Sequence, residues 1–542
     1  MNRRFRLQVA ALVALVLCYV AHFRLLDARI QDDAYISFRY ARHLAQGKGL
    51  VWNVGERVEG YTNFLWTLLM SVPLAISEQL NPIAFARAVS SFAGYGSIVV
   101  TFLLVRHLSP KSRLLPLAAP AMLAGSFPFA INTMTGLETI FFASLLTIAT
   151  FLLVLEQDDR RYRGSSVVYA LAALTRPEAI GLFLFTFGIV AWSQRREGKS
   201  AKDYLQRLGL PFAGIVASHV LFRLAYYGEI VPNTYFAKFG VELPQGMPTR
   251  TSYLWDFLAK GLDPIGLTTL FVVIFAFIKW RDVRARIVLA GALYGFFNVA
   301  VSGADFMIGF RYFVPYLPLL YVAATLGAAA LSECDKKAKA QRTIEMGTLA
   351  LALVAGFFGY NYSYDKLRPF EQLRHRVNAD SNTALGHWLA ESLPKDAVVV
   401  ARDIGEIGYL SDLHMIDMTG LTDREIARKP GNLLDRQLNV DDIFGRNPTA
   451  FVFVSRVPGP VQGPRRFAAY SSTHSTAAIL DDPRMKDQYT FVARYPSYER
   501  LRKADDGSWQ PVARGAGIPT DTMNTYFLEV YVRKDVASQL RN

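Results

Sequence analysis

Long apolar runs follow one another through the first two thirds of this chain. The first extends from Leu7 to Leu26, and further runs continue to about Tyr360. An α-helix needs about twenty apolar residues to cross the hydrocarbon core of a bilayer. Only 19% of the residues are charged and 52% are hydrophobic, whereas soluble domains carry about a quarter charged residues. We therefore predict a polytopic α-helical membrane protein.

The first apolar run has two interpretations. It follows three arginines, as the apolar stretch of a secretory signal peptide would: Arg3, Arg4 and Arg6. However, no cleavage site of small residues is evident before Asp32, and many more apolar runs follow. We interpret the run as an uncleaved first span.

The basic residues between the runs predict the topology. Six clusters of Lys and Arg lie in short loops, at residues 3–6, 106–113, 160–163, 195–202, 279–286 and 336–342. The positive-inside rule places all six in the cytoplasm. This predicts a cytoplasmic N-terminus, an external C-terminus and about eleven spans, at residues 7–26, 83–105, 114–131, 138–155, 166–175, 178–194, 207–227, 263–280, 286–302, 311–331 and 343–360. The segment 166–175 is too short to cross alone, so we expect it to belong to a broken helix.

The apolar run Phe64–Ile76 does not fit this alternation. If it crossed the membrane, every later basic cluster would lie outside, against the positive-inside rule. We expect a helix that lies on, or dips into, the outer leaflet.

The chain divides near residue 360 into two predicted domains. Residues 1–360 hold the spans, and residues 27–82 form the first external loop with its juxtamembrane helices. In residues 361–542, Leu385, Trp388 and Leu389 recur at helical spacing. Strand patterns occur at 397–401, 450–454, 489–492 and 527–532. We predict a soluble α/β domain here.

Neither the charge nor the cysteines indicate another class of partner. The net charge of +14 sits in loops between apolar runs, where topology explains it, and no nucleic-acid reader motif is present. The two cysteines, Cys18 and Cys334, lie in the first span and at a span end. We predict no disulfide, no metal-ligand spacing and no nucleic acid.

An acidic pair, Asp32 and Asp33, follows the first span directly. Paired carboxylates suit glycosyl transfer, because one can accept the proton of an acceptor hydroxyl while the other stabilises developing positive charge. The alternative is that the pair caps the helix that follows. In that helix Arg39 and His43 lie off the apolar face, which is typical of an amphipathic helix in the interface.

Other external loops also carry polar residues against span ends. They occur in the first loop and in the motifs TGLE, RPE, YYGEIVPNTYFAK and GADFMIGFRYFVP, and we assign substrate-binding roles to Glu59, Asn63, Glu138, Glu178, Asn233, Tyr235 and Asp305. Ionisable residues at membrane depth are candidates for function, although Arg176 and Glu178 could instead form an ion pair that fixes a helix break.

A lipid phosphate leaving group requires fixed cations. Arginine suits a phosphate because its planar fork donates two hydrogen bonds at once. We favour Arg176, Lys238 and Arg311 for this role, with Arg39 and His43 second. The alternative for Lys238 and Arg311 is contact with lipid headgroups.

The ordered motifs of residues 25–330 resemble a known family. DDAYISFRYARHLAQGKGLVWNVGERVEGYTN, TGLE, LTRPE, YYGEIVPNTYFAK and GADFMIGFRY are similar, in this order, to the terminal beta-1,2 arabinofuranosyltransferases of the mycobacterial cell wall and their bacterial relatives, in the GT-C superfamily. The resemblance implies a GT-C fold, a decaprenyl-phosphate arabinofuranose donor and inversion at the anomeric carbon. It also implies that Asp32 and Asp33 are catalytic and that Phe64–Ile76 is a juxtamembrane helix. The last domain would be periplasmic and contact carbohydrate. Its segment Ala401–Asp423 looks like Gram-negative-type relatives instead, which leaves the acceptor open.

We therefore predict an inverting glycosyltransferase of the bacterial cytoplasmic membrane with a periplasmic active site. It would transfer D-arabinofuranose, or a related sugar, from a polyprenyl-phosphate donor to a glycan or glycoprotein, with membrane lipids as further partners. The alternatives are a transporter or flippase of a lipid-linked sugar, a non-catalytic scaffold whose tail binds glycan, and a hydrolase. Transporters tend to show repeated halves and midplane ionisable groups, and we find no repeat here.

A divalent cation is a further expectation that the residues leave open. Mg²⁺, Mn²⁺ or Ca²⁺ would need hard oxygen ligands. Asp32, Asp33, Glu138 and Asp305 could supply them if the fold brings them together.

Overall fold

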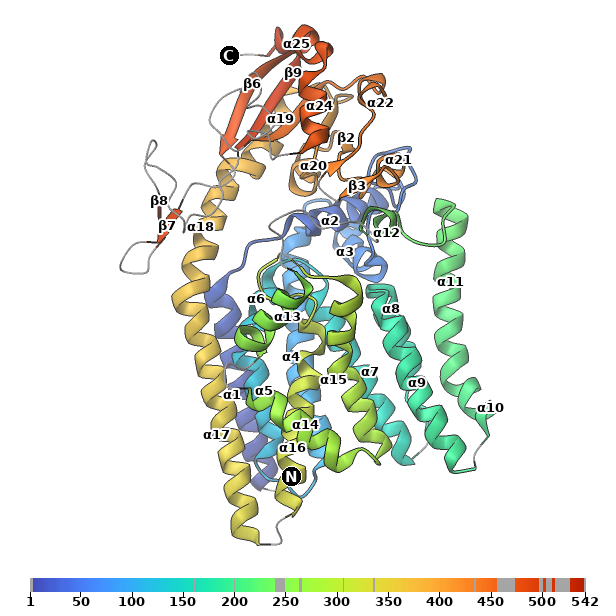
Figure 1. Cartoon of the computed structure of the whole chain (residues 1–542), viewed down its shortest axis with the longest axis vertical. Coiled ribbons are helices and arrows are strands. Elements are labelled where there is room, and N and C mark those ends of the chain that lie inside the picture. Colours follow the sequence, from blue (N-terminus) through green and yellow to red (C-terminus); the bar gives the residue numbers. More distant parts are fainter. Residues whose placement is uncertain are drawn as a thin grey trace.

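The structure, a computed structural model, has a bundle of long helices with an α/β domain at one end (Figure 1). It describes residues 3–159, 161–198, 200–238, 249–262, 266–305, 307–334, 337–432, 435–455, 473–496, 501–503, 509–511 and 527–540. The bundle and its loops contain α1 (Arg3–Leu26), α2 (Asp32–Ala45), α3 (Phe64–Ile76), α4 (Pro82–Leu108), α5 (Ala118–Gly125), α6 (Phe127–Met134), α7 (Thr139–Asp159), α8 (Ser165–Thr175), α9 (Glu178–Arg196), α10 (Ala201–Tyr204), α11 (Leu210–Tyr227), α12 (Asn233–Lys238), α13 (Arg250–Asp256), α14 (Leu267–Lys279), α15 (Val283–Ser302), α16 (Leu317–Cys334) and α17 (Ala338–Tyr362).

The long apolar helices make this a multi-pass membrane protein, as predicted. By length and composition, seven helical stretches of the described chain can cross a membrane: Phe5–Leu26, Pro82–Leu108, Thr139–Asp159, Lys202–Tyr227, Val283–Ser302, Val314–Cys334 and Ala338–Ser392. Two bent pairs, α5 with α6 and α13 with α14, raise this number to nine. The predicted number of eleven also counted α8, which has 11 residues, and α9, which has 19 residues but ends in two arginines.

The break between α8 and α9 lies at Arg176 and Pro177, as the RPE motif predicts. Two contacts tie α8 to α7. Near one end of α7, Glu156 accepts a hydrogen bond from the Ser165 hydroxyl at 2.6 Å. At its other end, Glu138 pairs with Arg176 at 2.7 Å. The short α8 therefore lies along α7 with a charged contact at each end.

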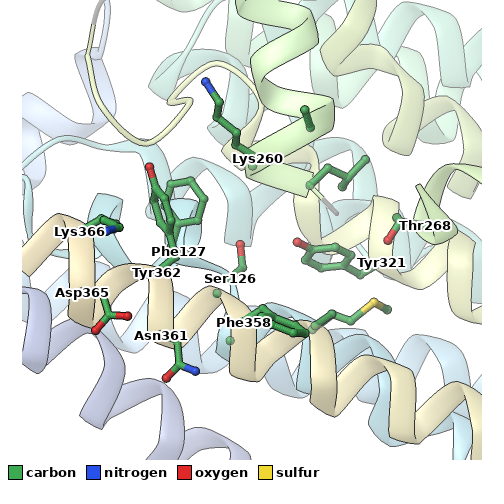
Figure 2. A pocket seen from close by; sticks show the side chains of 17 residues that line it. Ser126, Phe127, Lys260, Thr268, Tyr321, Phe358, Asn361, Tyr362, Asp365 and Lys366 are labelled. Carbon is green, nitrogen blue, oxygen red and sulfur yellow. The ribbon is translucent and has the colours of Figure 1, made fainter. Parts of the chain in front are cut away.

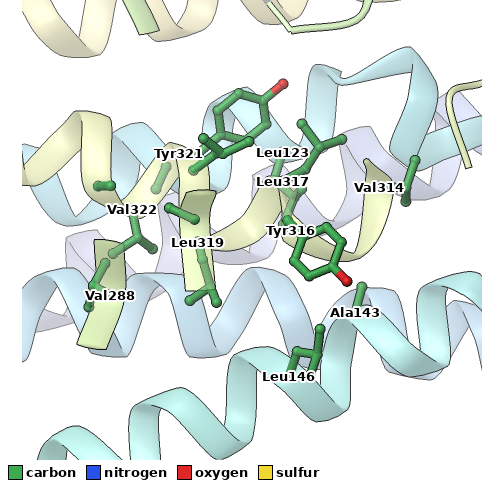
Figure 3. Packing of buried hydrophobic residues seen from close by; sticks show 14 of the residues in the cluster. Leu123, Ala143, Leu146, Val288, Val314, Tyr316, Leu317, Leu319, Tyr321 and Val322 are labelled. Carbon is green, nitrogen blue, oxygen red and sulfur yellow. The ribbon is translucent and has the colours of Figure 1, made fainter. Parts of the chain in front are cut away.

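Helix α16 packs against α4, α5, α14, α15 and α17, and Figure 3 shows part of this packing. Fifteen of its 18 residues are buried, as expected for a helix that is apolar on all sides. Small residues let neighbouring helices approach closely. A Cβ atom on Gly327 would lie 2.0 Å from the carbonyl oxygen of Phe271 in α14. Tyr316 and Tyr321 pack among the aliphatic side chains of this core.

Helix α2 is not the interfacial helix that its charge pattern predicted. It packs on α3 on one side and on a helix of the C-terminal domain on another. Arg39 is only 2% exposed and His43 only 1%. The polar face of α2 therefore contacts protein, not lipid headgroups. Helix α3 has the predicted bounds, Phe64–Ile76.

The C-terminal domain is α/β, as predicted, and contains a five-stranded sheet in the order β2-β1-β5-β9-β6. Strand β1 (Val398–Ala401) is parallel to β2 (His414–Asp417) and to β5 (Ala450–Ser455). Strand β9 (Phe527–Arg533) is antiparallel to β5 and to β6 (Tyr489–Pro496). Helices α19 (Ala384–Ser392), α20 (Gly405–Ser411), α21 (Arg424–Ala427), α22 (Val440–Gly445), α24 (His474–Asp481), α25 (Pro483–Gln488) and α26 (Lys534–Ala537) complete the domain, with the short pairs β3 (Gly431–Asn432) with β4 (Asp435–Arg436) and β7 (Leu501–Lys503) with β8 (Trp509–Pro511).

One continuous helical stretch, Ala338–Ser392, connects the two parts of the chain. It runs from α17 through α18 (Arg368–Asn378) to α19, and Figure 1 shows it reaching from the far end of the bundle to the sheet. At 1.5 Å per residue its 55 residues are about 80 Å long. The predicted boundary at residue 360 falls inside this helix.

Candidate functional site

Arg311 is the first residue around which the predicted site residues gather. It lies in the loop between α15 and α16, and its Nε–H donates to Asp305 at 2.8 Å. Its Nη1 lies 3.6 Å from the Asp33 carboxylate. Asp305 and Arg311 are buried, whereas one third of the Asp33 side chain is exposed. Asp33 therefore combines an accessible carboxylate with a fixed neighbouring cation.

The loop that carries Arg311 is held by α6. The side-chain amide of Asn132 donates to the carbonyl oxygen of Gly309 at 2.9 Å. Gly309 has φ +96°, and a Cβ atom there would lie 2.8 Å from Nδ2 of Asn132. Only glycine allows this backbone and this approach without strain, so the GFRY sequence places Arg311 beside Asp305.

The Tyr312 ring lies close to two arginines. The guanidinium carbon of Arg311 is 5.3 Å from the centre of its ring, and that of Arg176 is 5.9 Å from it. Both distances are within the range of cation–π contacts. The structure therefore brings Arg176 and Arg311 to one place, as predicted. Tyr312 itself was missed, although the arginine–tyrosine step in GFRY was the available signal.

Glu138 connects this cluster to the first external loop. Its carboxylate accepts from Nη1 of Arg176 and from the side-chain amide of Asn63, both at 2.7 Å. Asn63 in turn accepts from the Ser37 hydroxyl of α2 at 3.1 Å. Arg176 also donates to Glu178 at 2.6 Å. We call Asp33, Asp305, Arg311, Tyr312, Arg176, Glu138, Glu178 and Asn63 the arginine cluster.

Asp32 has a different environment from Asp33. Its two carboxylate oxygens accept hydrogen bonds from the backbone N–H groups of Gly405 at 3.0 Å and Glu406 at 2.8 Å. These groups form the first turn of α20 in the C-terminal domain. Burial, with the neighbouring carboxyl of Asp403, outweighs these hydrogen bonds and raises the pKa of Asp32 to about 7. The acidic pair does act as a helix cap, but on α20 and through Asp32 alone.

Arg39 and His43 are not placed to bind a donor phosphate. Arg39 donates to the carbonyl oxygens of Gly408 and Leu413, both at 2.6 Å. His43 bonds through Nδ1 to the Val51 carbonyl oxygen at 2.9 Å. Both side chains are buried. The structure corrects these assignments, because the side chains hold α2 against its neighbours.

Glu59 and Asn233 also have structural contacts. Glu59, 3% exposed, accepts two hydrogen bonds from Arg223 of α11 at 2.5 and 3.2 Å. The Asn233 amide donates to the carbonyl oxygens of Gly420 and Leu421 in the C-terminal domain. Arg223 was missed, although an arginine inside a predicted span is a signal in itself.

Lys238 and Tyr235 lie on α12, in the segment that follows α11. This helix packs against the C-terminal domain, where Arg436 donates to the carbonyl oxygen of Ala237. Lys238 is exposed, and the Tyr235 ring packs edge-to-face on Phe236 at 5.6 Å. The structure therefore gathers two of the three favoured cations, not all three.

The predicted divalent cation has no matching set of ligands. Within the part of the chain that the structure describes, no group of three or more His, Cys, Asp and Glu side chains could hold a metal ion. Asp305 and Glu138 each pair with an arginine, and Asp32 binds backbone amides. These residues do not fit a metal site, so we assign no step to a metal.

The arginine cluster can bind an anion and accept a proton. The guanidinium groups of Arg311 and Arg176 both lie near the Tyr312 ring and can donate hydrogen bonds to a phosphate. Their charge is already balanced by the carboxylates of Asp305, Asp33, Glu138 and Glu178, so a phosphate would be held through guanidinium hydrogen bonds and not by an excess of positive charge. Asp33 lies beside Arg311 and is accessible from solvent. The combination suits reactions in which a phosphate leaves while a hydroxyl loses a proton.

Comparison with solved structures shows which fold the chain has. The chain has the GT-C fold, as predicted: it matches ArnT from Cupriavidus metallidurans with a TM-score of 0.59 at 13% identity, covering 99% of both chains. The same protein bound to undecaprenyl phosphate matches with a TM-score of 0.56 at 14% identity, over 96% of this chain and 98% of that chain.

The predicted resemblance to arabinofuranosyltransferases is confirmed by two curated relatives. Both are named terminal beta-(1->2)-arabinofuranosyltransferase. The one from Mycobacterium tuberculosis is 31% identical over 44% of this chain and 40% of its own length. The one from Corynebacterium glutamicum is 28% identical over 54% and 47% respectively. The chain thus spans less than half of each relative. A family model described as a domain of unknown function (DUF8728) matches residues 370–513.

Proposed function

We propose that this chain is an inverting glycosyltransferase that takes its sugar from a polyprenyl-phosphate donor. The observation that carries the proposal is the accessible Asp33 carboxylate, 3.6 Å from Arg311, with the Arg176 guanidinium also within 6 Å of the Tyr312 ring centre. The two curated relatives support D-arabinofuranose as the sugar. The ArnT structure with undecaprenyl phosphate supports a lipid phosphate as the carrier.

In the proposed reaction an acceptor hydroxyl attacks the anomeric carbon of the donor sugar. The new bond joins the hydroxyl oxygen to that carbon, and the bond from the carbon to the phosphate oxygen breaks. The phosphate leaves with the bonding electrons and is held by Arg311 and Arg176. Asp33 takes the proton of the hydroxyl as general base. Attack from the side opposite the phosphate inverts the anomeric carbon.

Asp32 acts as a positioning residue in this proposal. Both of its oxygens already accept hydrogen bonds from α20, so it keeps the C-terminal domain against α2. Asn63 and Glu138 hold Arg176 in the same way. The acceptor is a glycan or glycoprotein on the periplasmic face of the cytoplasmic membrane, and the C-terminal domain contacts it.

The test compares Asp33→Asn with Asp32→Asn in the purified full chain. Transfer is measured from a panel of labelled polyprenyl-phosphate sugars that includes arabinofuranose. Asp33→Asn is expected to lower the rate by about 10²- to 10⁴-fold, the usual contribution of a general base. Its stability should change little, because a partly exposed ion pair contributes about 0–1 kcal/mol. Asp32→Asn should lower the rate far less. Unchanged transfer by Asp33→Asn would refute the assignment.

A further inference from the structure

A cavity of about 380 Å³ has lining residues that are distinct from the arginine cluster (Figure 2). Helices α5, α14, α16 and α17 border it. Its walls are mainly apolar, with Phe127, Tyr321 and Phe358 among them. Its charged lining residues are Lys260, Lys366 and Asp365. Its size is that of a small-molecule site.

Three interruptions of regular helix meet at this cavity. The chain bends by 55° between α5 and α6, at Gly125 and Ser126. The segments Phe257–Leu262 and Ser363–Leu367 are π-helical. Each of the three contributes lining residues. Irregular backbone at membrane depth persists only where protein buries it or where it lines a cavity, and π-helical turns occur frequently at functional sites. Because the bend and the two π-helical segments all line one cavity, we interpret the cavity as a binding site.

One buried polar group in the cavity has no partner in the protein. The Ser126 side chain is 6% exposed, and within the described chain its hydroxyl forms no hydrogen bond. Figure 2 shows this hydroxyl between Tyr362 and Tyr321. Leaving a buried hydroxyl unpaired costs about 1–3 kcal/mol. An occupant with a hydrogen-bonding group would remove this cost.

The lysines lie at the level expected for lipid headgroups. Helix α17 starts at Ala338, beside a basic cluster, and ends at Tyr362. Its 25 residues extend about 37 Å, slightly more than a hydrocarbon core. Lys366 follows four residues later. Lys260 pairs with Asp256 at 2.6 Å, but Lys366 forms no ion pair within the described ranges. Counted from Ala338, Phe358 lies about 30 Å along the helix, where a hydrocarbon core would end, and Lys366 lies about 12 Å further on.

We propose that this cavity binds a lipid phosphate, with one isoprenoid or acyl chain against Phe127 and Phe358 and the phosphate oxygens at Ser126 and Lys366. The site borders the loop of the arginine cluster through Phe310. A Cβ atom on Gly261 would lie 2.7 Å from the Phe310 ring, and the rings of Phe127 and Phe310 are 6.1 Å apart. Phe310 directly precedes Arg311 and has a left-handed backbone, φ +51°. A lipid in the cavity therefore packs beside the segment that positions Arg311.

Native mass spectrometry of the purified full chain tests this site without any transfer assay. Undecaprenyl phosphate and phosphatidylglycerol are added separately to the protein in detergent. Ala355→Leu fills the cavity from α17 and should lower the number of lipids bound per chain by one, because the arginine cluster can still hold a lipid phosphate. Lys366→Gln should weaken binding in the cavity about tenfold or more, because it removes a charge-assisted hydrogen bond. Ala350→Leu and Lys339→Gln make the same changes elsewhere on α17, on exposed positions, and should bind as the wild type does.

The comparison of the two lipids identifies the source of the phosphate. Binding of undecaprenyl phosphate alone would assign the site to an isoprenoid carrier, and binding of both would assign it to lipid phosphates in general. Wild-type binding in both Ala355→Leu and Lys366→Gln, or no binding of either lipid, would overturn the proposal. Because this measurement counts bound lipid and involves no transfer, a failure of the proposed function and a failure of this site can be told apart.

Discussion

Replacing Arg311 with lysine keeps the positive charge but removes the planar guanidinium group, which can donate several hydrogen bonds in fixed directions. In the structure Nε and Nη2 of Arg311 face the Asp305 carboxylate at 2.8 and 3.4 Å, while Nη1 faces Asp33 at 3.6 Å. A lysine ammonium can remain opposite Asp305 but cannot also offer a second, fixed donor to a phosphate. The variant keeps the charge balance of the buried pair, so we expect it to fold.

The expected loss follows from one charge-assisted hydrogen bond. Such a bond contributes about 1.5–3 kcal/mol, which corresponds to a fall in kcat/KM of about 10- to 150-fold. The assay is the initial rate of transfer at varied concentrations of the polyprenyl-phosphate sugar. Arg87→Lys is the matched control, because Arg87 bonds to the carbonyl oxygens of Met134 and Ala28, outside the arginine cluster. If Arg311→Lys were as active as this control, stabilisation of the leaving phosphate would not require the guanidinium group of Arg311.

Two further predictions concern buried carboxylates. Folding raises the pKa of Asp32 to about 7, so the folded chain binds this proton more tightly than the unfolded chain, and the contribution of Asp32 to stability falls as pH rises from about 4 to about 7. Thermal unfolding measured from pH 4 to 8 should show this loss of stability in the wild type but not in Asp32→Asn. Parallel pH profiles for the two proteins would contradict the prediction. Glu59→Met should destabilise the protein by roughly 3–5 kcal/mol because it leaves Arg223 buried without its partner. The double variant with Arg223→Met should recover most of this loss in unfolding measurements in detergent, and no recovery would show that the pair is not the cause.

The order of the elements was predictable because apolar periodicity and the placement of basic residues are local signals. Phe64–Ile76 was predicted with the bounds of α3, and the break at Arg176 follows from Pro177. The structure differs from the prediction where a side chain contacts a residue that is distant in sequence. Arg39 looked like a headgroup contact because its partners, Gly408 and Leu413, lie more than 360 residues away.

The candidate site was predictable in part for the same reason. Arg176, Glu138 and Arg311 belong to short motifs that mark the ends of apolar runs, where chemistry beside a membrane is expected. Sequence could not show that Arg176 and Arg311 both lie near Tyr312, or which carboxylates pair with each of them. Glu59 is the clearest case: its role depends on Arg223 of α11, 164 residues away.

The division of roles between Asp32 and Asp33 follows from their positions on one helix. Successive residues in an α-helix are about 100° apart around its axis, so neighbouring side chains diverge. On α2 one of them reaches the first turn of α20, which follows the carboxyl end of β1, and the other faces Arg311. In open α/β sheets with parallel strands, ligands bind outside the carboxyl ends of the strands. An acceptor glycan at the carboxyl ends of the parallel strands would therefore lie beside α20, which Asp32 contacts, and Asp32 is the residue next to the proposed base, Asp33. We expect substitutions in α20 to raise the KM for the acceptor more than they weaken donor binding.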